Sequence, residues 1–169
     1  AQLINRGHDY QTFLKGLERL RKRHLDVCVH IINGLPYETY DMMIETAKVV
    51  GKLDIQGLKI HNLFMLKDTA LHKMYLQKPF PLLSREDYIK LVVEQLTYIP
   101  DSVVIERLTG DAPLKDLVEP LWSIKKVTIL NDIDKLMKEE NLEDKKRIVI
   151  FDRYAYSNMY YPIPDMLKT

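Results

Sequence analysis

Three polar segments of the sequence follow or interrupt short apolar runs, and each holds side chains able to bind a ligand. Residues 30–38 (HIINGLPYE) combine glycine, proline and glutamate, residues 59–67 contain lysine and histidine, and residues 106–111 (ERLTGD) contain arginine and aspartate. Glycine lets the backbone approach a ligand closely, and an arginine fork suits carboxylates or phosphates. In proteins built of βα units, such groups gather at the C-terminal ends of the strands.

The first segment, residues 30–38, could be a ligand-facing loop. Gly34 follows an apolar run, Pro36 stiffens the chain after it, and Glu38 stands just before a predicted helix. There a carboxylate could accept hydrogen bonds from ligand hydroxyls, or simply favour the positive end of the helix dipole. The alternative interpretation is an ordinary strand-to-helix turn.

The second segment places Lys59 and His61 two residues apart in a strand-like run, so both should share one face of the strand. Burying both on an apolar wall is costly unless they meet partners or a polar cavity. This spacing favours a barrel lumen or an active-site wall. The alternative is the solvated face of an edge strand.

The third segment pairs Arg107 with Asp111 across a short turn. Arginine can bind a carboxylate or phosphate through two parallel hydrogen bonds. Asp111 could hydrogen-bond a ribose or order a neighbouring loop. The alternative is a structural ion pair between the two side chains.

The chain of 169 residues contains a single cysteine, Cys28. One thiol makes no internal disulfide and cannot by itself hold a metal cluster. A reducing, cytoplasmic setting fits this composition. Because Cys28 lies in an apolar run, we expect a buried, inert thiol rather than a nucleophile.

Several function classes find no support in the sequence. It contains no Gly-rich P-loop, no GxGxxG turn, no HExxH pair and no paired cysteines, so neither a phosphate cradle nor a zinc site is predicted. Lysine plus arginine number 25 and aspartate plus glutamate 24, which does not indicate nucleic-acid binding. No apolar run approaches the roughly 18–20 residues needed to span a bilayer, so no membrane partner is expected.

Hydrophobic periodicity predicts helices and strands in alternation. Apolar residues at three- and four-residue spacing predict helices over 10–23, 39–53, 84–99 and 123–139. Short apolar runs predict strands over 27–32, 57–65 and 103–108, with a further candidate at 148–151. This alternation implies parallel βαβ units whose strands are buried on both faces. The fold class is therefore α/β, either an open sheet or an arc of a (β/α) barrel.

Two features fall outside this pattern. Residues 139–147 are highly charged and predict a linker, and residues 148–169 form a tyrosine- and proline-rich extension with no assigned role. The letters DRYAYS in that extension slightly resemble a segment of thymidylate kinases, which leaves a nucleotide-binding enzyme as an alternative. The chain begins at Ala1 in helix-like sequence, so we expect a fragment, a processed chain or a trimmed one.

The segments HIINGLP, GLKIH and RLTGDAP occur together, in an order and spacing that resemble one family. The sequence is similar to a bacterial radical S-adenosylmethionine (radical SAM) subfamily described as predicted iron–sulfur oxidoreductases. That subfamily resembles the radical SAM domains of the Elongator catalytic subunit and of oxygen-independent coproporphyrinogen oxidases. The resemblance runs from about Leu3 to about Lys138.

The resemblance implies that residues 1–138 form the C-terminal part of a partial (β/α)6 TIM-like barrel. In this family a CxxxCxxC motif holds a [4Fe-4S] cluster, which coordinates SAM and cleaves it reductively to a 5′-deoxyadenosyl radical. This chain has no such motif. We therefore expect it to begin after the fourth strand of the barrel and to be inactive alone, with cluster ligands lying upstream.

The resemblance also implies roles for individual residues. Those expected near the SAM adenosine are Ile32, Gly34, Pro36 and Glu38. Those expected to border SAM or substrate are Lys59, Ile60 and His61. Those expected to contact substrate or close the barrel are Arg107, Thr109 and Asp111. Two positions depart from an expected glycine, Tyr37 and Asp68.

Three hypotheses follow. The first is a cytoplasmic fragment of a radical SAM iron–sulfur enzyme that contributes the wall facing SAM and an unidentified substrate. The second is a non-catalytic half-barrel that pairs with itself or with a cluster-bearing partner. The third is the nucleotide-binding enzyme suggested by the extension.

Overall fold

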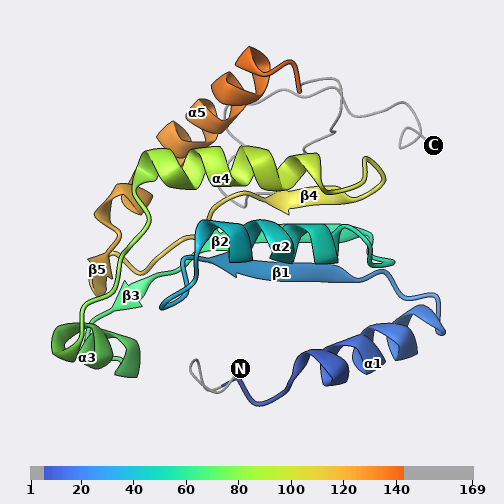
Figure 1. Ribbon diagram of the computed structural model, residues 1–169, viewed down its shortest axis with the longest axis horizontal. Helices are drawn as coiled ribbons and strands as arrows, with labels where there is room; N and C mark the ends of the chain where they lie inside the picture. The colour runs from blue at the N-terminus through green and yellow to red at the C-terminus, as the bar shows by residue number, and fades with distance from the viewer. Residues whose placement is uncertain (1–5, 143–169) are drawn as a thin grey trace.

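The computed structural model describes residues 6–142 (Figure 1). Its elements are, in chain order, α1 (Tyr10–Arg21), β1 (Cys28–Asn33), α2 (Tyr40–Val50), β2 (Gly57–Asn62), β3 (Met65–Leu66), α3 (Ala70–Gln77), α4 (Arg85–Thr97), β4 (Val104–Arg107), β5 (Leu117–Glu119), the 3-10 helix η1 (Leu121–Ile124) and α5 (Lys126–Glu139). The candidate strand at 148–151 and the extension at 148–169 lie outside the described residues, as does most of the predicted linker.

The main sheet consists of three parallel strands in the order β1-β2-β4. β1 and β2 are in register along their whole length, from Cys28 opposite Gly57 to Asn33 opposite Asn62. Helix α2 connects β1 to β2, and the longer connection from β2 to β4 contains α4. Parallel strands require such crossover connections. The predicted βαβ organisation is therefore confirmed.

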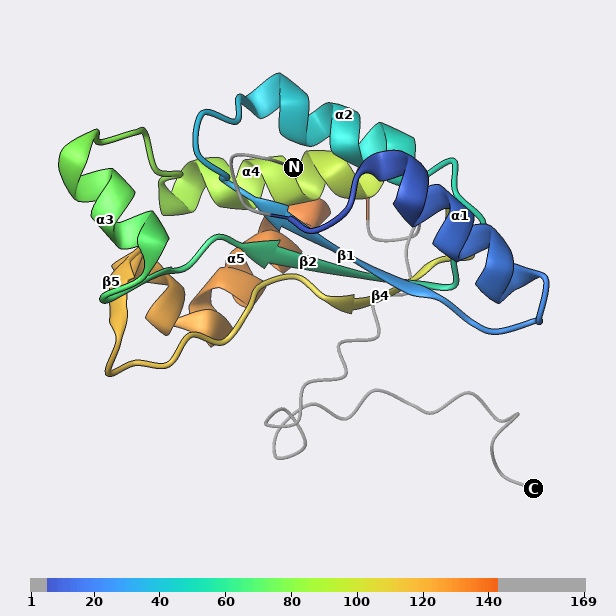
Figure 2. The ribbon, with the colours of Figure 1, turned by 90° about the horizontal axis from the view of Figure 1, so that it is seen from below.

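Helices α2 and α4 lie on one side of the sheet, and α5 packs against α4 (Figures 1 and 2). The core between them is apolar and combines strand residues such as Leu58, Ile60 and Ile105 with helix residues such as Val92 and Ile133. Burying each side chain of this size contributes about 1.5–3 kcal/mol. In the three-stranded sheet, the residues that point toward this core are therefore mostly apolar, and the alternate residues point away from it.

The prediction that the strands are buried on both faces is wrong for the described residues. Along β1, Val29 and Ile31 are buried while His30 and Ile32 are exposed. Because the helices that cover the sheet lie on one side, alternate strand residues point away from the core. We call the face opposite α2 and α4 the open face.

A second, two-stranded sheet pairs β3 with β5 antiparallel. It lies with α3 beyond the ends of β1 and β2 toward which their arrows point (Figure 1). The sequence did not predict this unit, because α3 has no buried residue and so no strong apolar stripe. The unit extends the molecule at the edge where the polar loops emerge.

Local signals fix the helix starts. Thr39, Thr69 and Ser84 each accept a hydrogen bond from the backbone N–H three residues on, at the N-caps of α2, α3 and α4. Ser84 thus caps α4 at the start of the helix predicted over 84–99. In α5 the Val127 side chain is 67% exposed, whereas Ile129 is buried. None of the described helices is long and apolar enough to cross a bilayer.

The two positions at which glycine was expected both adopt left-handed backbone conformations. Tyr37 has a φ of 63° and Asp68 a φ of 62°. L-residues pay about 1–2 kcal/mol for this region, and glycine pays no such penalty. The expectation of glycine therefore had a conformational basis, although other residues occupy the same backbone shape here.

Candidate functional site

The open face carries a row of basic side chains that crosses all three parallel strands. His30 on β1 lies opposite Lys59 on β2, and Lys59 lies opposite Arg107 on β4. Residues paired in this way point to the same face of a sheet. His61, two residues beyond Lys59 on β2, also lies on this face. The sequence predicted that Lys59 and His61 share one face.

Arg107 reaches this row because the pairing of β4 with β2 shifts by one residue. Leu58 pairs with Ile105, but Lys59 pairs with Arg107, which leaves Glu106 as the extra residue. In a regular strand Glu106 and Arg107 would point to opposite faces, whereas a bulge re-aims side chains locally. Both side chains therefore lie on the open face. Glu106 contacts Lys59 there, and Arg107 is the residue of β4 that pairs with Lys59.

Lys59 and Glu106 form the central ion pair of the open face, with Nζ 3.0 Å from Oε2. Burial alone would raise the pKa of Glu106, but hydrogen bonds from Lys59 and Cys28 hold it below its ordinary value. Gly57 leaves room for this carboxylate, since a Cβ there would come within 2.6 Å of Oε1 of Glu106. The Glu106 side chain was not predicted as a site residue.

The Cys28 thiol is half-buried beside Glu106. Burial, followed by the neighbouring carboxylate, raises the pKa of Cys28 to about 11. A thiol in this environment stays protonated near neutral pH and is a poor nucleophile and metal ligand. The expectation of an inert Cys28 thiol is in line with this raised pKa.

His30 and His61 stack on the open face, with ring centroids 5.6 Å apart and an interplanar angle of 26°. Burial, and then the positive charge of Arg107, lower the pKa of His61 to about 4. Burial and the charge of Lys59 also lower the pKa of His30. Nε2 of His61 is buried, and it has no hydrogen-bond partner within residues 6–142.

The loop after β1 is held by its own glutamate. Oε2 of Glu38 accepts hydrogen bonds from the backbone N–H of Gly34 at 3.1 Å and of Leu35 at 3.0 Å. Burial raises the pKa of Glu38, and the two N–H donors oppose that rise. Gly34 has a φ of 85°, and Pro36 is buried. The Glu38 carboxylate therefore binds the backbone of its own loop and stabilises one conformation of it.

A buried polar layer lies under this loop and was missed by sequence reasoning. Asn33 and Gln95 exchange two side-chain hydrogen bonds of 2.8 and 2.9 Å, and Thr109 donates one of 3.0 Å to Asn62. Asn33 and Asn62 are the last residues of β1 and β2 and lie opposite each other. The sequence signal that could have predicted this layer is that both strand segments, HIIN and KIHN, end in asparagine.

Next to this layer is a small recess of about 20 Å³, which is room for about one water molecule. Its lining residues come from both strand ends, the loop before α4 and the start of η1: Asn33, Gly34, Asn62, Leu63, Leu82, Leu83, Pro120 and Trp122. The recess thus connects the loop at Gly34 with the end of β2.

The third predicted segment forms an ion-pair cluster. Asp111 lies 3.7 Å from Nη1 of Arg107, and both of its oxygens lie 2.9 Å from Nζ of Lys126. The structural Arg–Asp pair considered as an alternative is therefore present. Gly110 allows close packing here, since a Cβ would come within 2.6 Å of the Phe64 ring.

The structure brings some of the predicted site residues together and separates others. Lys59, His61 and Arg107 share the open face. The side chain of Ile60 is wholly buried in the core on the opposite side of β2, so only its main-chain atoms could border a ligand. The Thr109 side chain is also fully buried, and its hydroxyl is bonded to Asn62.

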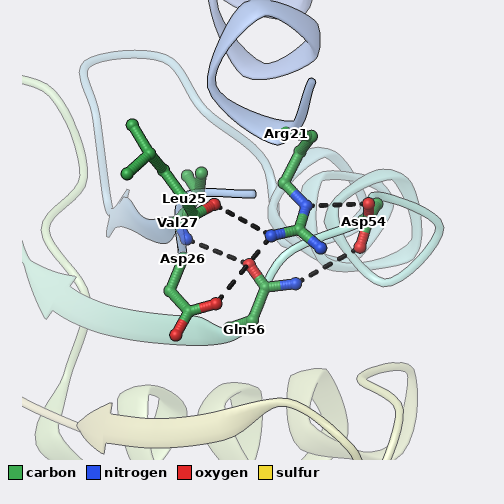
Figure 3. Close-up of polar contacts among 6 residues, drawn as sticks. All are labelled: Arg21, Leu25, Asp26, Val27, Asp54 and Gln56. Atoms are coloured by element: carbon green, nitrogen blue, oxygen red, sulfur yellow. Dashed lines mark hydrogen bonds and ion pairs between the residues drawn. The ribbon is translucent and has the colours of Figure 1, made fainter. Parts of the chain in front are cut away.

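The other end of the sheet is held by a network of a different kind. Arg21 at the end of α1 donates to Asp54 at 2.8 Å and to the Leu25 carbonyl at 2.8 Å, while Gln56 binds Asp54 and the Val27 N–H (Figure 3). These contacts join chain segments that precede β1 and β2. In βα folds this N-terminal edge serves stability, and ligands bind at the opposite edge.

Two protein-family models match this sequence. The family model of the radical SAM C-terminal domain matches residues 55–139, and that of the radical SAM superfamily matches residues 1–50. Together the two matches include β1, its loop, and every element from β2 to α5.

The chain belongs to the radical SAM family.

Curated proteins include relatives of similar sequence. The uncharacterised protein YtqA of Bacillus subtilis is 47% identical over 135 residues, which is 80% of this chain and 42% of that protein. The uncharacterised protein MJ0486 of Methanocaldococcus jannaschii is 34% identical over 86% of this chain and 46% of that protein. This radical SAM chain therefore spans less than half the length of these relatives.

A solved structure shows the same fold. The Elp3 protein of Methanocaldococcus infernus, lacking its N-terminal residues, superposes with a TM-score of 0.74 at 22% identity. The match covers 84% of this radical SAM chain and 33% of the Elp3 chain. The prediction of parallel βα repeats forming part of a radical SAM barrel is thus confirmed.

Proposed function

We propose that this chain forms the part of a radical SAM enzyme that faces the SAM adenosine and the substrate. The loop with Ile32, Gly34, Pro36 and Glu38 would lie beside the adenosine. Lys59 and His61 would border SAM or substrate, and residues 107–111 would contact substrate or close the barrel. Bound SAM, reduced by a [4Fe-4S] cluster, supplies a 5′-deoxyadenosyl radical in this family.

One observation carries the proposal: the basic and imidazole side chains lie on the sheet face that points away from the helices. Lys59, His61 and Arg107 are partly buried there although no apolar core needs them. A polar face next to the C-terminal strand ends is where barrels of this type bind ligands. Its position supports a wall of a ligand site more than a solvated surface.

The open face has one unpaired polar group that suits a polar nucleoside such as SAM, because the buried Nε2 of His61 lacks a partner among the described residues. A buried nitrogen left without a partner costs about 1–3 kcal/mol, which a ligand or an added barrel segment would recover. Gly34 allows close approach of the backbone.

The residues do not fit the cluster. A [4Fe-4S] centre in this family needs three cysteines, and this sequence has only Cys28, whose pKa is raised. Within residues 6–142 there is also no group of three histidine, cysteine or acidic side chains placed to hold a metal ion. In the proposal, cluster ligands therefore come from a segment other than these 169 residues.

Anaerobic reconstitution with iron and sulfide tests whether the cluster ligands lie outside these 169 residues. The 169-residue chain alone should show neither the absorption nor the EPR signal of a [4Fe-4S] cluster. The intact protein that carries this chain should show both and should bind SAM. A cluster held by the 169-residue chain alone would refute the proposal, as would an intact protein that binds a cluster but no SAM.

A second candidate function is a non-catalytic half-barrel that pairs with another chain. The observation that favours it is the position of β1 at the edge of the three-stranded sheet, where a further strand could pair. Light scattering coupled to size exclusion tests this candidate. A stable dimer that binds no SAM in the intact protein would favour it, and a monomer would count against self-pairing.

A further inference from the structure

We propose that Arg107 and His61 form a subsite for an oxyanion, a carboxylate or phosphate group of the substrate, on the open face. This inference rests on the proposed function only for the statement that the substrate lies at this face. The binding itself needs neither SAM nor a cluster, because every group that it uses belongs to this chain.

A bulge in β4 sets the position of Arg107 on the open face. It places Arg107 opposite Lys59 and leaves Glu106 to form the ion pair with that lysine at 3.0 Å. Without the shifted pairing, Arg107 would point toward the helices. Bulges of this kind are common beside binding sites, where they re-aim one side chain.

The guanidinium of Arg107 has one long ion pair among the described residues. Its ion pair with Asp111 is long, 3.7 Å from Nη1, whereas both oxygens of Asp111 lie 2.9 Å from Lys126. Asp111 is thus bound mainly by Lys126. Within residues 6–142, Arg107 makes no contact short enough for a charged hydrogen bond, so its planar fork of donors can receive an oxyanion through two parallel bonds.

His61 has a ring nitrogen without a hydrogen-bond partner among the described residues. Nε2 is buried, and the field of Arg107 is the strongest charge effect on this ring. A neutral imidazole with its proton on Nε2 donates one hydrogen bond, and an oxyanion held by Arg107 would accept it. The stacked His30 ring restricts the orientation of His61.

Carboxylates and phosphates share this chemistry, so the test uses both. The full 169-residue chain, ¹⁵N-labelled at histidine, is titrated with sodium phosphate and separately with sodium acetate, at ionic strength held constant with sodium chloride. We expect a saturable shift of the Nε2 resonance of His61 with at least one anion. Whether phosphate, acetate or both shift this resonance then shows which oxyanion the subsite accepts.

Variants connect the shift to the proposed residues. Arg107→Gln should weaken anion binding at least tenfold, and Arg107→Lys should weaken it less, because lysine keeps the charge but loses the fork. His61→Phe should also weaken binding, measured by the anion-dependent rise in thermal midpoint. The matched control is Arg23→Gln, in an exposed turn after α1, which should bind as the wild type does.

The inference is overturned if neither anion shifts His61 beyond the effect of chloride, or if Arg107→Lys and Arg107→Gln bind anions like the wild type. Circular dichroism spectra establish that the variants are folded, and Arg107→Lys remains informative if Arg107→Gln is not. Failure here leaves SAM binding by the intact protein untouched. Failure of SAM binding with anion binding preserved would overturn the proposed function instead.

Discussion

Asn33 and Gln95, which are 62 residues apart in the sequence, exchange two side-chain hydrogen bonds of 2.8 and 2.9 Å in the core. Gln95 also donates to the Met43 carbonyl at 3.0 Å. Both amides are almost fully buried. This pair ties the end of β1 to α4 and α2, directly below the loop that contains Gly34.

The first prediction concerns this pair. Gln95→Leu should lower the free energy of unfolding by about 1–3 kcal/mol, because it leaves the buried Asn33 amide without its hydrogen-bond partner. Urea denaturation measures the change. The double variant Asn33→Leu/Gln95→Leu should recover part of the loss, and Gln11→Leu, on the exposed side of α1, should change stability by less than about 0.5 kcal/mol. A loss in Gln11→Leu as large as in Gln95→Leu would contradict the buried-pair explanation.

A second prediction concerns the left-handed residue Asp68, whose φ is 62°. Asp68→Gly should raise the free energy of unfolding by roughly 0.5–1 kcal/mol, because relief of the backbone strain exceeds the entropy that glycine adds to the unfolded chain. Asp101→Gly, in an exposed turn without positive φ, should lower stability instead. Changes of the same sign in both variants would show that the backbone conformation is not the cause.

The third prediction concerns pH. Burial and the charge of Arg107 lower the pKa of His61 from 6.5 to about 4. Below about pH 6.5 the unfolded chain takes up a proton that the folded chain accepts only near pH 4, so stability should fall between pH 6.5 and 4. His61→Asn should flatten this part of the stability profile in urea titrations. Equal slopes in the two proteins would contradict the assignment to His61.

A fourth prediction concerns the loop glutamate. Glu38→Ala removes the acceptor of the Gly34 and Leu35 N–H groups and should cost about 1–3 kcal/mol. Amide hydrogen exchange at these two residues should accelerate, and less so in Glu38→Gln, which keeps one carbonyl oxygen. Glu45→Ala, on the exposed side of α2, serves as the control. Unchanged exchange in Glu38→Ala would show that the loop does not depend on the carboxylate.

The sequence predicted most of the main sheet and its helices because apolar spacing directly reflects the covered face. It also predicted that Lys59 and His61 share one face, since alternation along a strand is a local property. The orientation of Arg107 could not be predicted, because it depends on a register shift between two strands. The role of Gln95 was missed for a similar reason: its partner Asn33 is distant in the sequence.

Two errors have a common physical origin. Parallel strands were expected to be buried on both faces, yet the helices that cover this sheet lie on one side, so His30 and Ile32 are exposed. The unit of α3, β3 and β5 was not expected, because its short elements bury few apolar side chains. Hydrophobic periodicity arises from burial, so it does not predict helices or strands whose side chains are barely buried. The domain boundaries at 139 and 148 remain predictions.

Equilibrium binding of SAM to the intact, cluster-reconstituted protein tests the central claim most directly. In Gly34→Ala the added Cβ would lie 3.2 Å from the Leu83 side chain at a φ of 85°, so the substitution strains the loop. We predict SAM affinity at least tenfold weaker, about 1.4 kcal/mol, with cluster content unchanged. Gly16→Ala, whose Cβ meets nothing within 4 Å, should bind SAM normally. Normal SAM affinity in Gly34→Ala would contradict the proposal that this loop faces the cofactor.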